Sequence, residues 1–397
     1  MKSPQPLRLM IWLVFIVPGW MPSVAQAEPS APSPASSPIS ESERMRFERA
    51  ADYSASHAGR AVLIMRDGQV VFERYDRGWT AERPHPLASG TKSFTGVMAM
   101  LAVQDGILTL DELAADTLTE WKADPLKSKI TVRHLLTLSS GLPAGDRELS
   151  GGRSGSRLLG DVAEKRIKRL GLAQDGARPK NANLSALALE AVNEPGTRFQ
   201  YGPSHFYAFS ELLQRKLQAA NRPQKTTLEY LQQRLLQPLG IRVARIGRDE
   251  AGNPNLPGGM LLTAREWSQF GQFVLDGGSV RQADGTKQEL LKPELLEACF
   301  EPSVANPRYG LTWWLRTADA QADSGRVLGQ ARRQLEQTEA IDGPDGKPLR
   351  IRMAAGLGKQ RLYVIPQYQT VVVRFAEGDL VGQRFSDPAF IKPILGL

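Results

Sequence analysis

The chain has 397 residues, of which 41% are hydrophobic and 23% are charged, and its formal net charge is +8. This length is ample for a buried core and is typical of one large domain or two lobes. The single cysteine, Cys299, cannot form an internal disulfide, which excludes a disulfide-held scaffold. It lies in an amphipathic helical pattern with no neighbouring histidine, and this context favours a buried small hydrophobe over a catalytic thiol.

The first 27 residues have the parts of a secretory signal peptide. Lys2 and Arg8 form a positive segment, residues 9–17 form an apolar run, and residues 25–27 (Ala-Gln-Ala) form a cleavage site. The run is too short to span a bilayer, which takes about 20 apolar residues, and an uncleaved anchor is the alternative. We expect cleavage after Ala27, a periplasmic or secreted protein of formal charge +6 (+8 less Lys2 and Arg8), and no membrane span in it.

The next segments predict a linker, a helix and a hairpin. Residues 28–41 are rich in Pro, Ser and Ala, which is typical of a flexible linker. Residues 42–58 predict a helix. Residues 61–75 predict two antiparallel strands joined by a tight turn at Asp67 and Gly68.

Residues 86–106 predict a helix that carries a nucleophile on its first turn. Ser89 precedes an apolar run at helical spacing, and Lys92 follows it by three residues, so the hydroxyl and the amine can meet on one face. A serine hydroxyl is activated when a neighbouring base takes its proton, and a desolvated lysine can have its pKa lowered enough to do so. Backbone N–H groups at a helix start also favour a developing oxyanion.

The alternative is a capping serine beside a solvated lysine. Ser-x-x-Lys is short, and a chain of this length holds about one by chance. Two observations favour the catalytic interpretation. The motif at Ser89 is the only one in the chain, and the apolar residues after it indicate a buried helix, in which a lysine on the first turn needs a reason.

Longer stretches are more specific than this motif. They are residues 89–97, residues 104–111 and residues 130–143, the last a predicted short helix that ends at Ser-Ser-Gly-Leu-Pro. Together they resemble the serine β-lactamase-like hydrolases, in particular the branch of class C β-lactamases, family VIII esterases, D-Ala-D-Ala peptidases and 6-aminohexanoate-dimer hydrolases. The resemblance extends over roughly residues 45 to 397.

The resemblance implies an α/β (α+β) fold of the β-lactamase/transpeptidase type, with an antiparallel sheet flanked by helices and a mainly helical lobe. We expect one serine hydrolase domain over residues 42–397. Residues 42–106 and 260–397 would form the α/β lobe and residues 107–259 the helical lobe, with the active site between them. Residues 318–350 look like an insertion near the substrate entrance, and residues 144–157 like a mobile loop.

The resemblance also implies a catalytic tyrosine. Tyr201 matches the family's Tyr-x-Asn loop, in which the phenol shares a proton with the serine and the lysine. A tyrosine packed in the core is the alternative. The asparagine position holds Pro203, which has no side-chain amide, and Ser204 is a candidate to replace it in substrate binding.

The family's third motif, Lys-Thr-Gly or His-x-Gly, does not occur near the C-terminus. Residues 356–360 instead resemble a Gly-x-Gly-x-Gln version. This implies that the backbone N–H of Leu357 and that of Ser89 form the oxyanion hole, with Gly356, Gly358 and Gln360 as candidate substrate-binding residues. A tight glycine turn at an edge strand is the alternative, and it is compatible with the oxyanion hole.

Other chemistries have little support in the sequence. There is no Gly-x-Ser-x-Gly elbow, no metal-ligand spacing among the four histidines and no phosphate-binding glycine loop, so we expect no metal and no cofactor. A histidine-based triad stays open but is not favoured. The basic run at residues 164–169 lacks stacking aromatics, and a solvated helix face is preferred to nucleic-acid binding.

The sequence therefore predicts an exported serine hydrolase that cleaves a small-molecule ester or linear amide. Ser89 would form the acyl-enzyme, with Lys92 and Tyr201 as proton shuttle. Because the third motif normally helps to hold a substrate carboxylate, a β-lactamase or D-Ala-D-Ala peptidase is the second choice, with Lys359 or Arg361 as substitute cations. A non-catalytic envelope binding protein is the alternative of another class. The oligomeric state stays open.

Overall fold

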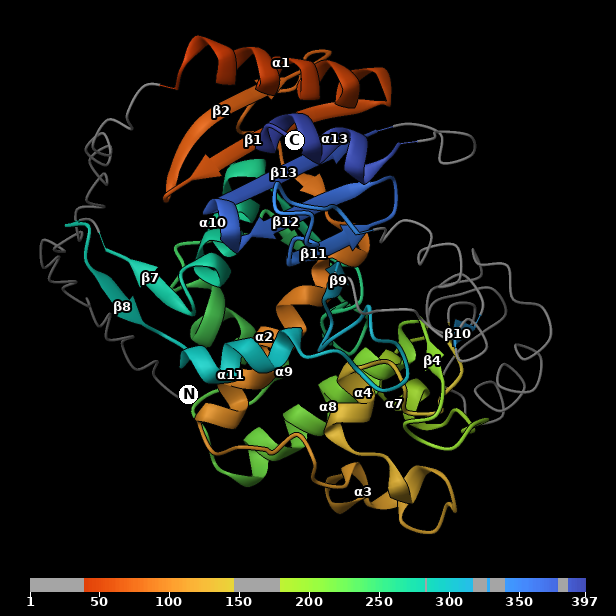
Figure 1. Ribbon diagram of the computed structural model, residues 1–397. Helices are drawn as coiled ribbons and strands as arrows, with labels where there is room; N and C mark the ends of the chain where they lie inside the picture. Colours follow the sequence, from red (N-terminus) through yellow and green to blue (C-terminus); the bar gives the residue numbers. More distant parts are fainter. Residues whose placement is uncertain (1–38, 146–178, 283, 317–326, 329–339, 378–384) are drawn as a thin grey trace, which may run out of the picture. The chain divides into compact units, whose positions relative to one another are not determined.

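The computed structural model describes residues 39–145, 179–282, 284–316, 327–328, 340–377 and 385–397 (Figure 1). The predicted signal peptide, the basic run and most of the predicted linker, of the loop at 144–157 and of the insertion at 318–350 lie outside these ranges. Among the described residues, no helix combines the length and the apolar character that a bilayer span needs.

A six-stranded antiparallel sheet combines strands from the N-terminal and C-terminal parts of the described chain. Its strand order is β2-β1-β13-β12-β11-β9, so strands from residues 59–75 pair with strands from residues 314–376. The strands are β1 (Gly59–Arg66), β2 (Gln69–Tyr75), β9 (Trp314–Arg316), β11 (Ile351–Gly356), β12 (Gln360–Ile365) and β13 (Thr370–Ala376). Asp67 and Gly68 both have positive φ, as the predicted tight hairpin between β1 and β2 requires.

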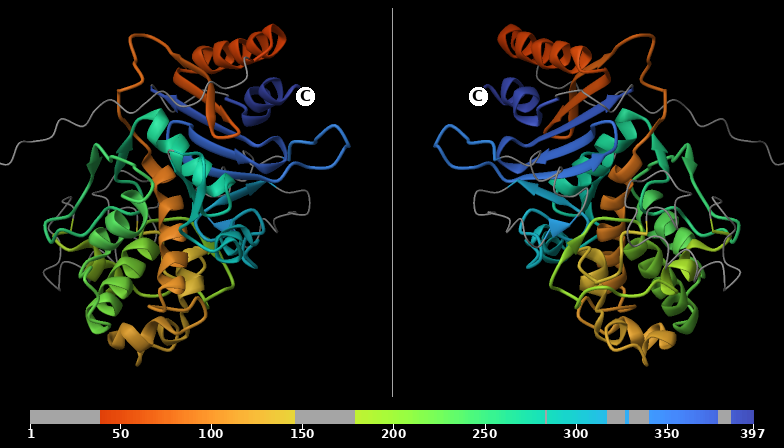
Figure 2. Two further views of the ribbon diagram at one scale, coloured as in Figure 1. Left: turned by 90° about the vertical axis from the view of Figure 1, so that its left-hand side faces the viewer. Right: turned by 90° about the vertical axis from the view of Figure 1, so that its right-hand side faces the viewer.

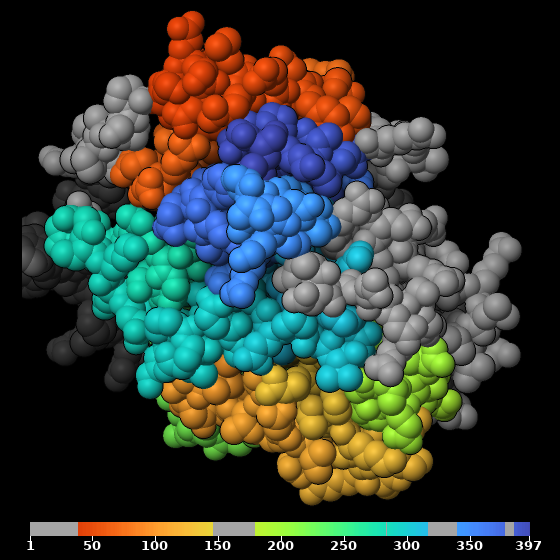
Figure 3. All heavy atoms as spheres, in the orientation of Figure 1, coloured from red at the N-terminus to blue at the C-terminus, as the bar shows by residue number. Residues whose placement is uncertain are grey.

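One face of this sheet is covered by the two terminal helices. The helix α1 (Glu41–Ser56) begins at a Ser40–Glu43 capping box, and it packs on β1 and on α13 (Asp387–Leu395). Figure 2 shows both helices on the same side of the sheet, and Figure 3 shows their atoms side by side. The predicted helix at 42–58 is thus confirmed, displaced by one or two residues.

The opposite face is covered by α10 (Ala264–Leu275), which packs on β1, β12 and β13. A Cβ at Gly271 of α10 would lie 2.6 Å from a methyl group of Val371, so the glycine permits this close approach. The helix α2 (Lys92–Gln104) lies beyond α10, and the rings of Phe94 and Phe270 stack between them at 3.8 Å. Its residues 92–102 are all buried, as the apolar pattern predicts.

The described residues of the region 107–259, namely 107–145 and 179–259, are mainly helices and loops. Their helices are α3 (Ala114–Thr117), α4 (Val132–Leu136), α7 (Ala182–Leu187), α8 (Ser204–Ala219) and α9 (Thr227–Leu231), which continues as the π-helical turn η4 (Gln232–Leu236). The short strands outside the main sheet are β3 (His85–Pro86), β4 (Phe199–Gln200), β5 (Arg245–Ile246), β6 (Met260–Leu262), β7 (Ser279–Arg281), β8 (Lys287–Glu289) and β10 (Val327–Leu328). The remaining short helical segments are η1 (Ala88–Thr91), η2 (Thr119–Trp121), η3 (Lys127–Lys129), α11 (Pro293–Glu297), η5 (Ala298–Phe300) and η6 (Pro366–Tyr368).

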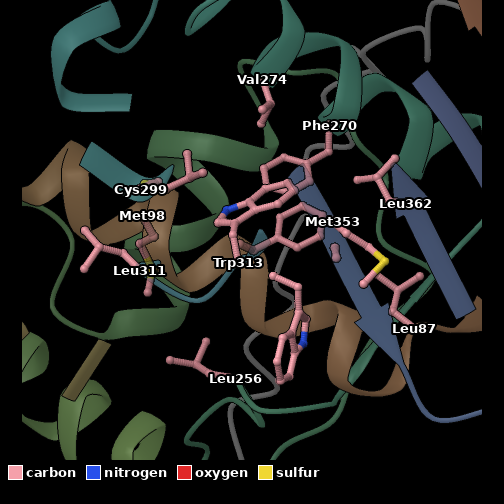
Figure 4. Close-up of a cluster of buried hydrophobic side chains, with 14 of the residues drawn as sticks. Leu87, Met98, Leu256, Phe270, Val274, Cys299, Leu311, Trp313, Met353 and Leu362 are labelled. Carbon is pink, nitrogen blue, oxygen red and sulfur yellow. The ribbon is translucent and has the colours of Figure 1, made fainter. Parts of the chain in front are cut away.

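The core near α2 and α10 is built around large aromatic side chains. Trp313 is fully buried and stacks on Phe270, with Met353 and Leu362 of the sheet close by (Figure 4). Cys299 belongs to the same cluster, and burial raises its thiol pKa well above the usual value. A buried, protonated thiol is a poor nucleophile, and this supports the structural assignment of Cys299.

Candidate active site

Ser89 lies on a short helical turn, η1, that leads directly into α2. The preceding residue, Ala88, has a φ of 48°, which non-glycine residues seldom adopt. The turn is attached to β6, because the Leu87 N–H donates to the Met260 carbonyl and the Met260 N–H donates to Thr91 Oγ1. The backbone around Ser89 is therefore fixed on both sides, with a strained residue, Ala88, directly before it, and such strain is frequent at functional sites.

Lys92 is the first residue of α2, and its side chain is buried. Its Nζ lies 3.0 Å from Ser89 Oγ and also donates to the Pro257 carbonyl at 2.6 Å. The predicted meeting of hydroxyl and amine is thus present, one helical turn apart. The Pro257 carbonyl holds the amine, so the amine can accept the serine proton without moving.

Tyr201 is brought to the same place from a distant part of the sequence. The Lys92 Nζ lies 5.0 Å from the centroid of the Tyr201 ring and 5.3 Å from that of Phe206. On its other side the Tyr201 ring contacts Trp314, at 5.7 Å between centroids. The three predicted catalytic side chains, Ser89, Lys92 and Tyr201, therefore form one cluster.

The departure from the family's asparagine has a structural consequence. Pro203 is the N-cap of α8, where a fixed φ suits the start of a helix. The hydroxyl of the next residue, Ser204, is buried and donates to the Pro143 carbonyl at 2.5 Å. Ser204 thus ties the Tyr201 loop to residues 138–145, and a contact of Ser204 with substrate stays a prediction.

The end of β11 approaches the nucleophile turn closely. A Cβ on Gly356 would lie 2.0 Å from the Leu87 carbonyl oxygen, so only glycine fits here. The next residue, Leu357, is exposed at the turn that leads to β12. This places the Leu357 backbone close to the chain segment of Ser89. A two-donor oxyanion hole requires this proximity.

One candidate substrate residue has another task. The Gln360 side chain is buried, and both of its amide atoms bond to the Ala376 backbone, the nitrogen to the carbonyl at 2.8 Å and the oxygen to the N–H at 2.9 Å. A substrate contact would require this bridge to break. Gln360 is thus used within the sheet, and its contact with substrate stays a prediction. Gly358 has a φ of 79° and shapes the β11–β12 turn, and its role toward substrate stays a prediction.

The two cations that could replace the third motif differ in position. Arg361 is buried and donates to the Asp387 carboxylate at 2.9 Å and to the carbonyls of Gly356 and Gln360. It is used within the fold, and this argues against a role in holding a substrate carboxylate. Lys359 is half-buried, and desolvation together with the nearby Arg361 lowers its pKa to about 8.

The histidines have structural contacts. His134 accepts the Thr131 N–H at 3.2 Å and completes the N-cap of α4, and His85 is packed between Trp79 and Phe375. Within the described ranges, no group of three histidine, cysteine or acidic side chains is placed to hold a metal ion.

The site contains one group that the sequence did not reveal, the Pro257 carbonyl. From the sequence, residues 257–267 are interpreted as structural. Their contact with Lys92 is made by a backbone oxygen, and the type of a residue does not show where its backbone oxygen lies. The carbonyl lies 165 positions along the chain from Lys92, and the attachment of the turn to β6 brings it to the amine.

The fold and the cluster define a class of enzyme. An antiparallel sheet built from both chain ends, with a serine and a lysine in contact at the start of a buried helix, is the arrangement of β-lactamase-fold serine hydrolases and acyltransferases. The sequence model of the Beta-lactamase family matches residues 45–392. The chain therefore belongs to that family.

Solved structures show the same fold. EstCE1, described as a hydrolase with promiscuous acyltransferase activity, is 18% identical with a TM-score of 0.58, over 89% of this chain and 97% of its own. Simvastatin synthase (LovD) from Aspergillus terreus is 18% identical with a TM-score of 0.57, over 89% of this chain and 96% of its own.

A curated relative matches a shorter region. The monacolin J acid methylbutanoyltransferase of Aspergillus terreus is 30% identical over 178 residues. The match covers 40% of this chain and 37% of that enzyme, so more than half of the relative's length is not aligned.

Proposed function

We propose that this protein is an exported serine hydrolase that cleaves esters or linear amides through an acyl-enzyme on Ser89. The observation that carries the proposal is the 3.0 Å contact between Lys92 Nζ and Ser89 Oγ in a buried setting. A non-catalytic binding protein would have no use for a buried lysine held on a serine by a backbone carbonyl. Export rests on residues 1–27 and is part of the proposal.

The reaction has two steps, acylation and deacylation, and in both steps Lys92 and Tyr201 transfer the protons. Ser89 Oγ attacks the substrate carbonyl and gives its proton to the Lys92 and Tyr201 pair, which passes it to the departing alcohol or amine. The N–H groups of Ser89 and Leu357 hold the oxyanion, and one such donor stabilises the transition state by about 3 kcal/mol. Water, deprotonated by the same pair, then attacks the acyl carbonyl and releases the acid and free Ser89.

Ester or linear amide substrates are favoured over β-lactams by the placement of charge. Arg361 is bonded to Asp387. The charged groups that act on Lys359 include Arg361, Arg374 and Asp387. A required substrate carboxylate would thus lack the cation that Arg361 was expected to provide. Turnover of a chromogenic cephalosporin with no turnover of p-nitrophenyl esters would reverse this preference in favour of β-lactamase activity.

Acyl transfer to an alcohol is a second candidate. The observation that favours it is the 30% identity to a methylbutanoyltransferase over 178 residues. In chemical terms, an alcohol replaces water in the second step and an ester forms instead of an acid. Adding methanol to the ester assay separates the two activities, since a transferase yields the methyl ester and a strict hydrolase only the acid.

Covalent labelling tests the central assignment. We expect a fluorophosphonate probe to add one mass increment to the wild-type protein and none to Ser89→Ala. The matched control is Ser93→Ala, one turn along the same helix, because the Ser93 hydroxyl donates to the Thr312 carbonyl and not to Lys92. This control should label normally. Equal absence of label on wild type and Ser89→Ala would favour a binding protein.

A further inference from the structure

His205 is a buried side chain with two strong hydrogen bonds and no role in the chemistry above. It is the second residue of α8, four positions after Tyr201, and it is fully buried. Its Nε2 lies 2.7 Å from the Gln200 carbonyl oxygen, and its Nδ1 lies 2.8 Å from Ser140 Oγ.

These partners fix the state of the imidazole. A carbonyl oxygen can only accept, so Nε2 carries the hydrogen and donates to Gln200. In a neutral imidazole Nδ1 then carries no hydrogen and accepts, so the Ser140 hydroxyl donates to it, while the Ser140 oxygen also accepts the Leu142 N–H at 3.3 Å. A neutral imidazole with the hydrogen on Nε2 satisfies every bond in this chain, whereas a protonated one would require the Ser140 hydroxyl to turn and accept from Nδ1.

The hydrogen-bond chain acts on the residue next to the catalytic tyrosine. The Gln200 N–H donates to the Leu138 carbonyl at 2.8 Å, and its carbonyl accepts from His205. On the other side of Tyr201, the Ser204 N–H donates to the Ala144 carbonyl at 3.2 Å. The backbone around Tyr201 is thus attached to residues 138–144 at several points. The His205 ring adds a side-chain link, because it bonds both to the Gln200 carbonyl and to Ser140.

We propose that neutral His205 is a positioning residue that holds the Tyr201 loop so that the phenol faces Lys92 and Ser89. The inference rests on the proposed function, because it needs Tyr201 to move protons. Positioning of this kind matters because a displacement of about 1 Å at a reacting group can cost about a hundredfold in rate. His205 itself touches neither the serine nor the lysine in any contact described above.

A double-mutant cycle tests the proposal. The rate of fluorophosphonate acylation and the steady-state constants for a p-nitrophenyl ester are measured for wild type, His205→Ala, Tyr201→Phe and the double variant. We expect His205→Ala to lower kcat by about tenfold to a hundredfold with KM changed by less than about twofold. In the Tyr201→Phe background, His205→Ala should lower kcat further by less than about twofold.

Controls separate positioning from loss of structure. His205→Gln keeps one donor and one acceptor and should recover part of the lost rate. His134→Ala removes a half-buried histidine that caps α4, and it should leave kcat unchanged. If His205→Ala does not fold, Ser140→Ala removes the partner of Nδ1, together with the acceptor of the Leu142 N–H, and should give a smaller loss of the same kind, again dependent on Tyr201.

The outcomes are distinct from those for the proposed function. Equal losses from His205→Ala with and without Tyr201 would overturn the positioning role. So would an unchanged rate of His205→Ala when the wild type is labelled on Ser89. Absence of label on the wild type would instead overturn the proposed function.

Discussion

At the scale of single residues, the site depends on two close approaches that leave no room for change. The Pro257 carbonyl holds the Lys92 amine at 2.6 Å, and Gly356 brings β11 against the Leu87 carbonyl. Sequence analysis finds Ser89, Lys92 and Tyr201 because their chemistry depends on residue type. It cannot find the Pro257 carbonyl, and the resemblance that makes Gln360 a candidate for substrate binding does not reveal its bonds to the Ala376 backbone.

Replacing Gly356 by alanine tests the approach of β11. The new Cβ would lie 2.0 Å from the Leu87 oxygen, so the strand end must move away from the nucleophile turn. We expect kcat for an ester substrate to fall by about a hundredfold, since the Leu357 donor moves with the strand. The control is Gly247→Ala, where a Cβ has its nearest neighbour at 3.6 Å. Equal activities of the two variants would contradict the predicted contact.

At the scale of elements, α13 is attached to the sheet by a buried charge cluster. Asp387, the first residue of α13, pairs with Arg316 at 3.1 Å and with Arg361 at 2.9 Å, and it accepts the Tyr363 hydroxyl. These partners come from β9 and β12, so one carboxylate joins the last helix to two strands. The nearby arginines hold the Asp387 pKa at about 2 although burial alone would raise it.

Asp387→Asn should therefore destabilise the fold strongly. Removing one partner of a buried charge network leaves the other charges uncompensated, which costs about 3–5 kcal/mol. The measurement is the urea midpoint of unfolding at pH 7. Asp116→Asn, at an exposed position of α3, is the control and should change the free energy of unfolding by less than about 0.5 kcal/mol. A midpoint for Asp387→Asn equal to that of the control would contradict the role of the cluster.

At the scale of the whole molecule, buried histidines make folding sensitive to mild acid. Burial lowers the pKa of His205 to about 4, with a further lowering by Lys92, and burial also lowers the pKa of His85 to about 4. The ordinary pKa of a histidine is 6.5, so between pH 6.5 and 4 the unfolded chain binds more protons than the folded one. The free energy of unfolding therefore falls as the pH drops through this window.

The pH dependence can be assigned to His205 by substitution. For this fully buried group the loss between pH 6.5 and 4 is on the order of 3 kcal/mol. We expect urea midpoints of wild type measured from pH 7 to pH 4.5 to fall more steeply than those of His205→Gln, which cannot take up the proton. The Asp387 pKa of about 2 places its own effect lower, between pH 3.8 and 2. Parallel pH profiles of the two proteins would refute this assignment.

The sequence by itself determined the helix of the nucleophile, the hairpin at residues 61–75 and the family. Each depends on a local pattern: apolar spacing after Ser89, turn residues at Asp67 and Gly68, and motifs whose residue types carry the chemistry. The tertiary structure alone decided which backbone groups meet these residues. The Pro257 carbonyl at Lys92, the His205 bond beside Tyr201 and the use of Arg361 inside the fold join positions far apart in the chain or use atoms that every residue has. Such contacts follow from packing of the whole chain, and no local pattern records them.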